Sequence, residues 1–219
     1  MTQKFELVVF DWDGTLMDSP GRIVASMAAA TADVGLTVLP EAAYRDVIGL
    51  GLWEALTSLF PTADRAMLEA FVERYRHYFL EACPTEAPLF GGAHELLRAV
   101  ADSGAFLAVA TGKSRAGLDR VLAQTQCESY FHATRTADET CSKPDPRMLL
   151  EIIDELEVSP ANVLMVGDTE YDLEMAVRAG TPAVAVSFGA HAPERLAAYE
   201  PLACMNSLPQ LQQWLATRL

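Results

Sequence analysis

The chain has 219 residues, of which 51% are hydrophobic and 21% charged, a globular composition that excludes disorder as its overall state. Its 16 Lys and Arg residues are outnumbered by 30 Asp and Glu residues, which gives a formal net charge of −14. Because so acidic a chain repels polyanions and contains no basic run, we expect neither a nucleic-acid nor a membrane partner. If the ligand is anionic, a metal ion is the first candidate to mediate its binding.

The cysteines and the N-terminal region bear on the cellular compartment. The four cysteines form no C-x-x-C pair, which argues against a zinc or iron–sulfur site and favours free thiols in a reducing compartment. The apolar run at residues 7–10 stops at Asp11, so we expect no signal peptide. No stretch approaches the roughly 18 consecutive apolar residues of a membrane-spanning helix. We therefore expect a cytoplasmic protein.

Short apolar runs alternate with helical patterns along most of the chain. Each run ends abruptly and is too short for a buried helix, so it is typical of a strand buried on both faces. The strong candidates are residues 7–10, 106–110, 163–166 and 183–186, and the weaker ones are 130–133 and 202–205. Gly104 and Gly180 stand where helices should end. The alternation predicts an α/β fold with a Rossmann-like, doubly wound parallel sheet.

One long segment interrupts this alternation. From Ser19 to about Pro84 there is no candidate strand. Helical patterns instead cover residues 23–34, 41–48, 52–60 and a longer stretch from Met67 to Phe79, with Gly and Pro between them. We expect a four-helix cap at residues 17–84, inserted into a core of residues 1–16 and 85–219.

The first candidate motif is Asp11-Trp12-Asp13-Gly14-Thr15, directly after the first strand. Ligands of open parallel sheets bind at the carboxyl ends of the strands. One carboxylate there can attack a phosphorus atom, and the other can give a proton to the leaving oxygen. The alternative is an Asx-type turn, and the D-x-D pattern alone does not separate the two.

Two further clusters follow the next strands. Thr111 offers a hydroxyl, and Gly112 offers a backbone amide for an oxyanion, although Thr111 or Ser114 can also cap a helix. Lys113 is either a substrate contact or a surface lysine. Lys143 precedes a proline, and it either neutralises a phosphate or lies exposed.

The last cluster contains Asp168 and Asp172, at the end of a strand and one helical turn further on. Carboxylates in this arrangement suit Mg²⁺, although capping of the following helix is an alternative. Gathering four acids around a single lysine would cost several kcal/mol per desolvated ion, and a divalent metal relieves most of that cost. The joint arrangement therefore predicts a metal site.

In this order, D-W-D-G-T, A-T-G, K-P and G-D-T-x-x-D resemble the four motifs of the haloacid dehalogenase superfamily over nearly the whole chain. The helical insertion is similar to the four-helix cap of its phosphoglycolate-phosphatase-like members. The resemblance implies that Asp11 is the nucleophile that forms an aspartyl-phosphate and that Asp13 is the general acid and base. It implies that Thr111 and Lys143 bind the phosphoryl group. Mg²⁺ would be held by Asp11, the main-chain carbonyl of Asp13 and Asp168, with Asp172 supporting, directly or through water.

The expected activity is Mg²⁺-dependent hydrolysis of a small phosphate monoester. The aspartate at position 13 favours phosphate esters over haloacids, because halide departs without a proton. Gly112, Lys113 and Arg45 of the cap are the candidate substrate contacts, and Arg45 could meet a second anionic group. The alternatives are a sugar-phosphate mutase or a pyrophosphatase on the same scaffold, and, in another class, a phospho-receiver or a catalytically silent binding protein. We expect a monomer or a weak homodimer.

Overall fold

Six parallel strands form the centre of the computed structural model, which describes residues 4–219. They are β1 (Leu7–Phe10), β2 (Phe106–Thr111), β3 (Ala133–Thr136), β4 (Val163–Gly167), β5 (Ala183–Val186) and β6 (Cys204–Met205). Their order is β3-β2-β1-β4-β5-β6, and every neighbouring pair is parallel. The chain builds outward from β1 in both directions, which places a switch point beside β1. The predicted doubly wound parallel sheet is confirmed.

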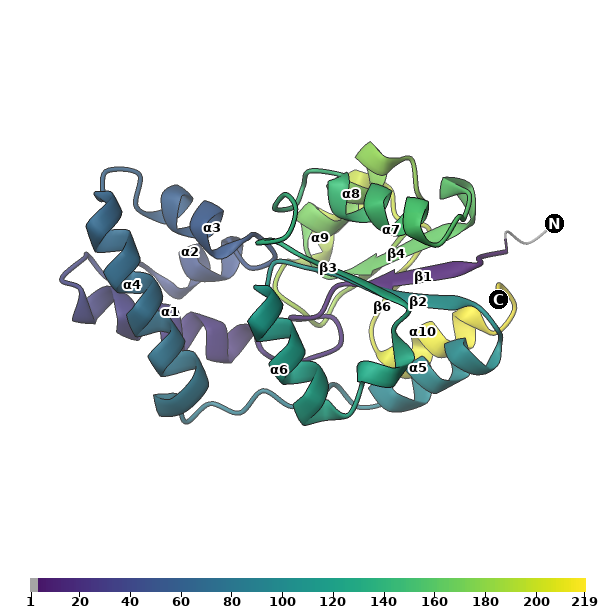
Figure 1. Ribbon diagram of the computed structural model, residues 1–219, viewed down its shortest axis with the longest axis horizontal. Helices are drawn as coiled ribbons and strands as arrows, with labels where there is room; N and C mark the ends of the chain where they lie inside the picture. The colour runs from purple at the N-terminus through teal and green to yellow at the C-terminus, as the bar shows by residue number, and fades with distance from the viewer. Residues whose placement is uncertain (1–3) are drawn as a thin grey trace.

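Helices cover both faces of this sheet (Figure 1). One face packs against α5 (Ala93–Asp102), α6 (Arg115–Thr125) and α10 (Leu208–Leu215). The other packs against α7 (Arg147–Glu155), α8 (Glu170–Ala179) and α9 (Pro193–Leu196). Along β1, Val8 and Phe10 point to the first layer and Leu7 and Val9 to the second, as the alternation of a strand requires. All four are fully buried, which explains the unbroken apolar run.

Local signals in the sequence begin and end several of these helices. Ser114 caps α6 by accepting a hydrogen bond from the Gly117 amide at 3.2 Å. A reciprocal capping box of Thr169 and Asp172 begins α8. This helix ends at Gly180, whose φ of 72° is a left-handed conformation.

Four helices follow β1 and form the inserted segment, at the left of Figure 1. They are α1 (Pro20–Asp33), α2 (Glu41–Asp46), α3 (Leu52–Leu59) and α4 (Arg65–His77), and a π-helical turn over Tyr78–Ala82 extends the last of them. Their inward side chains form a separate apolar cluster. The backbone of Met17 pairs with both Asp13 and Leu89, so the chain enters and leaves the insertion side by side. The assignment of residues 17–84 to a cap domain stays a prediction.

The two weaker predicted strands begin later in the sequence than predicted. The run at residues 130–133 overlaps a 3₁₀ turn at Glu128–Tyr130, and the strand begins only at Ala133. Tyr130 and Phe131 pack beside the core from outside the sheet, so their apolar character arises from packing and not from strand pairing. In the run at residues 202–205, only Cys204 and Met205 are in the strand.

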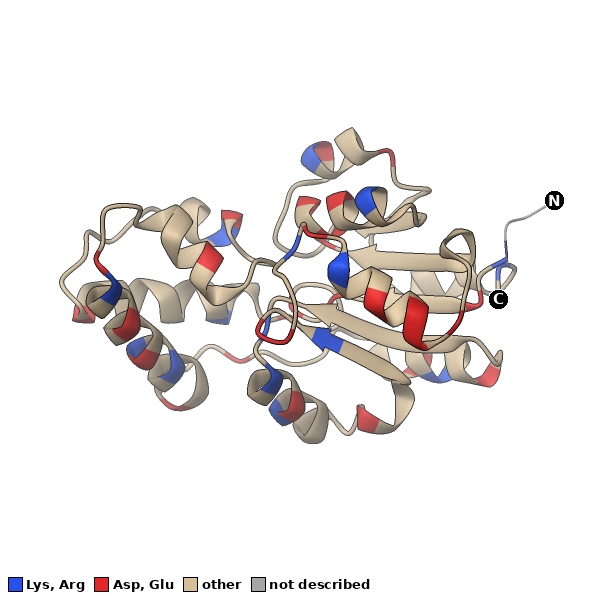
Figure 2. Cartoon of the chain, turned by 45° about the horizontal axis from the view of Figure 1, so that its top comes forward, with Lys and Arg blue, Asp and Glu red and all other residues tan. Residues whose placement is uncertain are grey.

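The acidic residues are dispersed over the helices of both the insertion and the core, which Figure 2 shows. The excess of negative charge is therefore mostly a property of the surface. Within the described part of the chain, no helix has the length and apolar character needed to cross a membrane.

A pair of glycine variants tests the backbone requirement at the end of α5. Gly104 has a φ of 85° and no atom within 4 Å of the position of an added Cβ. Gly104→Ala should therefore lower the free energy of unfolding by about 1–2 kcal/mol through backbone strain alone. Gly91→Ala is the matched control, because Gly91 has equal space and no left-handed φ. Urea unfolding followed by circular dichroism measures both, and equal stabilities would contradict the explanation.

Candidate active site

Four loops that follow strands bring the predicted site residues together. Asp11 follows β1, Thr111 ends β2, and Asp168 follows β4. Lys143 lies in the loop between β3 and α7. All four are buried, with at most 1% of their surface exposed. Because the strands are parallel, their carboxyl ends meet at one edge, and residues far apart in sequence converge there.

Lys143 is the central cation of this cluster. Its ammonium nitrogen donates to Asp11 Oδ1 and to Asp172 Oδ1, each at 2.6 Å. The alternative of an exposed lysine is therefore wrong. Although burial opposes the charged form, the carboxylates of Asp11 and Asp172 raise the pKa of Lys143 above its ordinary range. Lys143 therefore remains protonated.

Burial raises the pKa of the carboxyl groups, whereas it acts to lower the pKa of Lys143. It raises the pKa of Asp11 to about 7, and the positive charge of Lys143 opposes this shift without cancelling it. Burial also raises the pKa of Asp168, with Asp11 and Asp172 adding to the effect. Each carboxyl group would ionise more readily if a cation stood among them.

The arrangement of oxygens suits such a cation. Asp11, Asp168 and Asp172 each offer a carboxylate oxygen, and these atoms lie within 4.8 Å of one another. Asp11 Oδ2 is buried and has no hydrogen-bond partner in the structure. A buried carboxylate oxygen without a partner is costly, and Mg²⁺ prefers oxygen ligands of this kind. The residues present therefore fit a magnesium ion.

Asp172 has more partners than the sequence suggested. Its Oδ1 binds Lys143, while its Oδ2 accepts from the amide of Thr169 at 3.1 Å and from its hydroxyl at 2.7 Å. The capping alternative is thus also present, and the two arrangements coexist. Because both oxygens are engaged, Asp172 is better placed to support the site than to be its main ligand.

Asp13 lies apart from the three clustered carboxylates and has its own partners. Its Oδ1 accepts a hydrogen bond from Ser19, and its Oδ2 lies 2.8 Å from the ammonium nitrogen of Lys113. Lys113 is therefore not a free surface lysine. The two contacts fix the direction of the Asp13 carboxylate.

Two positioning residues were missed at the sequence level. Ser19 is one, and Thr15 is the other, whose hydroxyl donates to Asp168 Oδ1 at 2.8 Å. The amide of Ala190 donates to Asp168 Oδ2 at 2.6 Å. Thr15 and Ser19 belong to the same loop as Asp11 and Asp13, so polar residues close to a strand-end motif were the available signal.

The insertion contacts the site through a glycine-rich turn at residues 49–51. An added Cβ at Gly112 would lie 2.4 Å from the carbonyl oxygen of Leu50, and one at Gly49 would lie 2.9 Å from Thr169 Oγ1. The Gly51 amide donates to Ser142 Oγ at 2.7 Å. The turn thus rests on the loops that follow β2, β3 and β4. Gly112 permits the close approach at the first of them.

The one substrate contact predicted in the insertion, Arg45, is not paired with the residues of the cluster. Arg45 is half-buried near the end of α2, and among residues 4–219 its side chain forms no ion pair or hydrogen bond with the site residues. Tyr75 and Phe79 approach instead. Burial and then the carboxylate of Asp13 raise the pKa of Tyr75, and the Phe79 ring centroid lies 5.0 Å from the Lys113 nitrogen.

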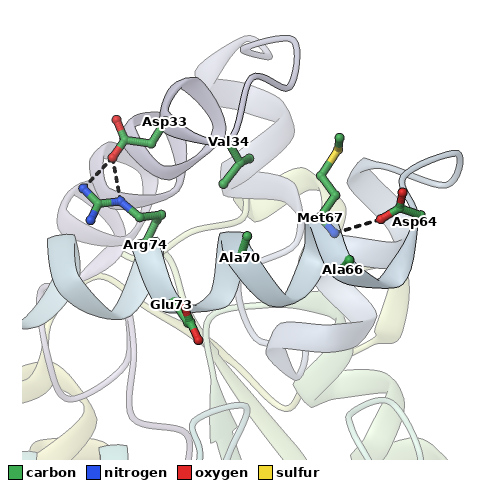
Figure 3. Close-up of a pocket in the computed structure, with 8 residues that line it drawn as sticks. All are labelled: Asp33, Val34, Asp64, Ala66, Met67, Ala70, Glu73 and Arg74. Atoms are coloured by element: carbon green, nitrogen blue, oxygen red, sulfur yellow. Dashed lines mark hydrogen bonds and ion pairs between the residues drawn. The ribbon is translucent and has the colours of Figure 1, made fainter.

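An open groove of about 500 Å³ lies elsewhere, on the insertion between α1 and α4 (Figure 3). Its lining includes Asp33 and Arg74, which pair with each other. No residue that lines the groove belongs to the buried acidic cluster. The groove is therefore separate from the candidate active site.

Comparisons with known proteins agree with this geometry. The family model of haloacid dehalogenase-like hydrolases matches residues 8–186. The probable phosphatase IndB of Dickeya dadantii is 35% identical over 94% of this chain and 91% of its own. A phosphoglycolate phosphatase of Mesorhizobium japonicum is 29% identical over 97% and 96%.

The same fold is known from crystallography. The crystal structure described as a haloacid dehalogenase-like hydrolase from Bacteroides fragilis superposes with a TM-score of 0.86 at 27% identity, covering 95% of this chain and all of the other. The match of the family model, the sheet order and the convergence of the four motifs lead to one conclusion. The chain belongs to the haloacid dehalogenase-like hydrolases.

Proposed function

We propose that this hydrolase is a Mg²⁺-dependent phosphatase that acts on a small phosphate monoester through an aspartyl-phosphate on Asp11. One observation carries the proposal. Asp11 is buried beside Lys143, and its second carboxylate oxygen has no partner. The named relatives that are phosphatases support the same reaction class.

The metal would be held by the carboxylates of Asp11 and Asp168 together with the main-chain carbonyl of Asp13, with Asp172 supporting. When bound, Mg²⁺ neutralises negative charge on the phosphoryl oxygens. Lys143 contributes a second positive charge on the side of Asp11. Thr111 ends β2 and Gly112 follows it, and we propose that the hydroxyl of the first and the amide of the second donate hydrogen bonds to the same group.

The reaction divides into two steps. A carboxylate oxygen of Asp11 attacks phosphorus, the bond from phosphorus to the ester oxygen breaks, and Asp13 gives its proton to the departing oxygen. A water molecule then attacks the aspartyl-phosphate, Asp13 takes its proton, and inorganic phosphate leaves. The proton that Asp13 gives in the first step is returned in the second, and the second step also frees the Asp11 carboxylate. Both aspartates therefore end in their starting form.

The leaving group would lie between the core and the insertion. Lys113 stands beside Asp13 and against the ring of Phe79, so it can bind a second anionic group of the substrate. A substrate similar to phosphoglycolate fits this arrangement, and Arg45 stays a second candidate contact for its anionic group. We also propose that the protein works in the cytoplasm as a monomer or a weak homodimer. The four thiols are all free, which is compatible with that location.

The nucleophile can be tested by one substitution. Asp11→Asn should lower kcat by at least about a thousandfold, because an amide cannot form the acyl-phosphate. Release of phosphate from a panel of phosphate esters, with and without Mg²⁺, is the measurement. Asp18→Asn removes an exposed carboxylate from the same loop and should leave turnover unchanged. Turnover retained by Asp11→Asn would remove Asp11 as the nucleophile, and an isomerised sugar phosphate without free phosphate would indicate a mutase.

The positioning of Asp13 predicts a dependence on the leaving group. Ser19→Ala removes the hydrogen bond to Asp13 Oδ1, so proton donation should become slower. We expect the rate of the first step, formation of the aspartyl-phosphate in single-turnover measurements, to fall about tenfold for alkyl phosphates, a part of the usual general-acid contribution, and to change little for p-nitrophenyl phosphate. The matched control is Ser26→Ala, at a buried serine two turns further along α1. Equal losses in this first step on both substrates would show that Ser19 does not act through proton donation by Asp13.

The raised pKa of Asp11, about 7, gives a prediction about pH and metal. In the metal-free protein, the folded state keeps a proton that the unfolded chain releases above about pH 4. Stability should therefore fall as pH rises towards 7. Because Mg²⁺ needs ionised carboxylates, it should raise Tm more at pH 8 than at pH 6.

Differential scanning fluorimetry at the two pH values measures this difference. At a concentration 100 times its dissociation constant, Mg²⁺ should raise the free energy of unfolding at pH 8 by about 2.7 kcal/mol. Asp11→Asn is the control, because it removes the ionisation and should abolish most of the metal effect. A Mg²⁺ effect on Tm that is the same at both pH values would contradict the prediction.

A further inference from the structure

An ion pair between α2 and α9 joins the insertion to the core. Asp46 is the last residue of α2, and its carboxylate pairs with Arg195 of α9. The two residues are 149 positions apart in the sequence. The negative end of the helix dipole repels a carboxylate at the C-terminal end of a helix. A cationic partner therefore stabilises the Asp46 carboxylate there.

Arg195 is held from the core side. Its Nε donates to Glu170 Oε2 at 2.6 Å, and its Nη2 contacts the other oxygen of the same carboxylate. This two-point contact fixes the plane of the guanidinium. Arg195 is consequently oriented by the first residue of α8 before it meets Asp46.

The main chain of Asp46 is held as well. Its carbonyl oxygen, which has no partner within the helix, accepts a hydrogen bond from Tyr171 Oη at 2.9 Å and lies 3.1 Å from His191 Nε2. Three core side chains therefore converge on one residue of the insertion. Among the described residues, no other position of α2 receives so many contacts from the core.

The contacts of Asp46 bear on the turn at residues 49–51, which lies three to five residues further along the chain. The turn at residues 49–51 rests on the loops that carry Gly112, Ser142 and Thr169. A shift of Asp46 would move this turn, since only Val47 and Ile48 separate them. Through the turn, the ion pair influences how tightly the insertion covers the end of the sheet.

We infer that Arg195 is a positioning residue, which holds the insertion closed over the active site through Asp46 and takes no part in the chemistry. The inference rests on the proposed function only for its kinetic consequence. Closure covers the substrate and leaves the nucleophile in place, so loss of the pair should raise KM more than it lowers kcat.

The experiment measures closure without requiring activity. Hydrogen exchange at the Gly51 amide, which donates to Ser142 across the contact, reports opening of the insertion. Asp46→Asn and Arg195→Gln should each raise this exchange rate by roughly two- to fivefold, the effect of a partly exposed ion pair. The double variant should exchange no faster than Arg195→Gln, because that variant already removes the ion pair with Asp46.

Three controls separate the ion pair from a general loss of stability. Glu69→Gln breaks the exposed pair with Arg65 on the same insertion and should change neither exchange nor KM. Asp46→Glu keeps the charge and should restore most of the protection. Raising the salt concentration should accelerate exchange in the parent protein but not in Asp46→Asn.

The outcomes are distinct. Faster exchange in both single variants without an additive effect in the double, accompanied by a rise in KM, supports the role of Arg195. Unchanged exchange in Asp46→Asn, or fully additive effects in the double variant, would overturn it. If exchange responds as expected while no phosphate ester is hydrolysed even by the parent protein, the closure stands and the proposed phosphatase function fails.

Discussion

The contact of Lys143 with Asp11 and Asp172 is the interaction on which the site depends. It places an ammonium group, with its side chain fully buried, between two carboxylates that are equally hidden from water. Desolvating each ion costs several kcal/mol, and only close, hydrogen-bonded pairing offsets that cost. Removing any one of the three would leave the others buried without compensation. The pairing thus fixes where the Asp11 carboxylate stands.

The surrounding fold makes this burial sustainable. The strands that lead to Asp11 and Asp168 are apolar along their length, so the backbone is fixed by the sheet before the charged residues begin. Asp172 has two structural roles. One of its oxygens accepts the hydrogen bond from the Thr169 amide that caps α8, and the other accepts a hydrogen bond from Lys143. The same side chain therefore links the position of a helix to the position of the lysine.

The sequence predicts those features that depend on neighbouring residues. The four strong strands, the glycines that end helices and the strand-end acids are local patterns, and the parallel direction of the strands follows from their alternation with helices. Contacts between distant residues leave no such pattern. The pair of Arg195 with Asp46 joins residues 149 positions apart, and only the folded chain shows it. Likewise, Lys113 could be assigned to Asp13 only when both loops were seen at the same end of the sheet.

The net charge of −14 acquires a more specific meaning at this site. Asp11, Asp13, Asp168 and Asp172 are opposed by two ammonium groups, those of Lys113 and Lys143, and not by one. The remaining formal excess is two negative charges, which one divalent cation would cancel. Lys113 also distinguishes Asp13 from the other three acids, because Asp13 has its own cationic partner. Asp11, with its unpartnered oxygen, Asp168 and Asp172 are then the clustered carboxylates that could hold a metal ion. With such a cation bound, the charges at this edge of the sheet would balance, and an anionic ligand could approach it.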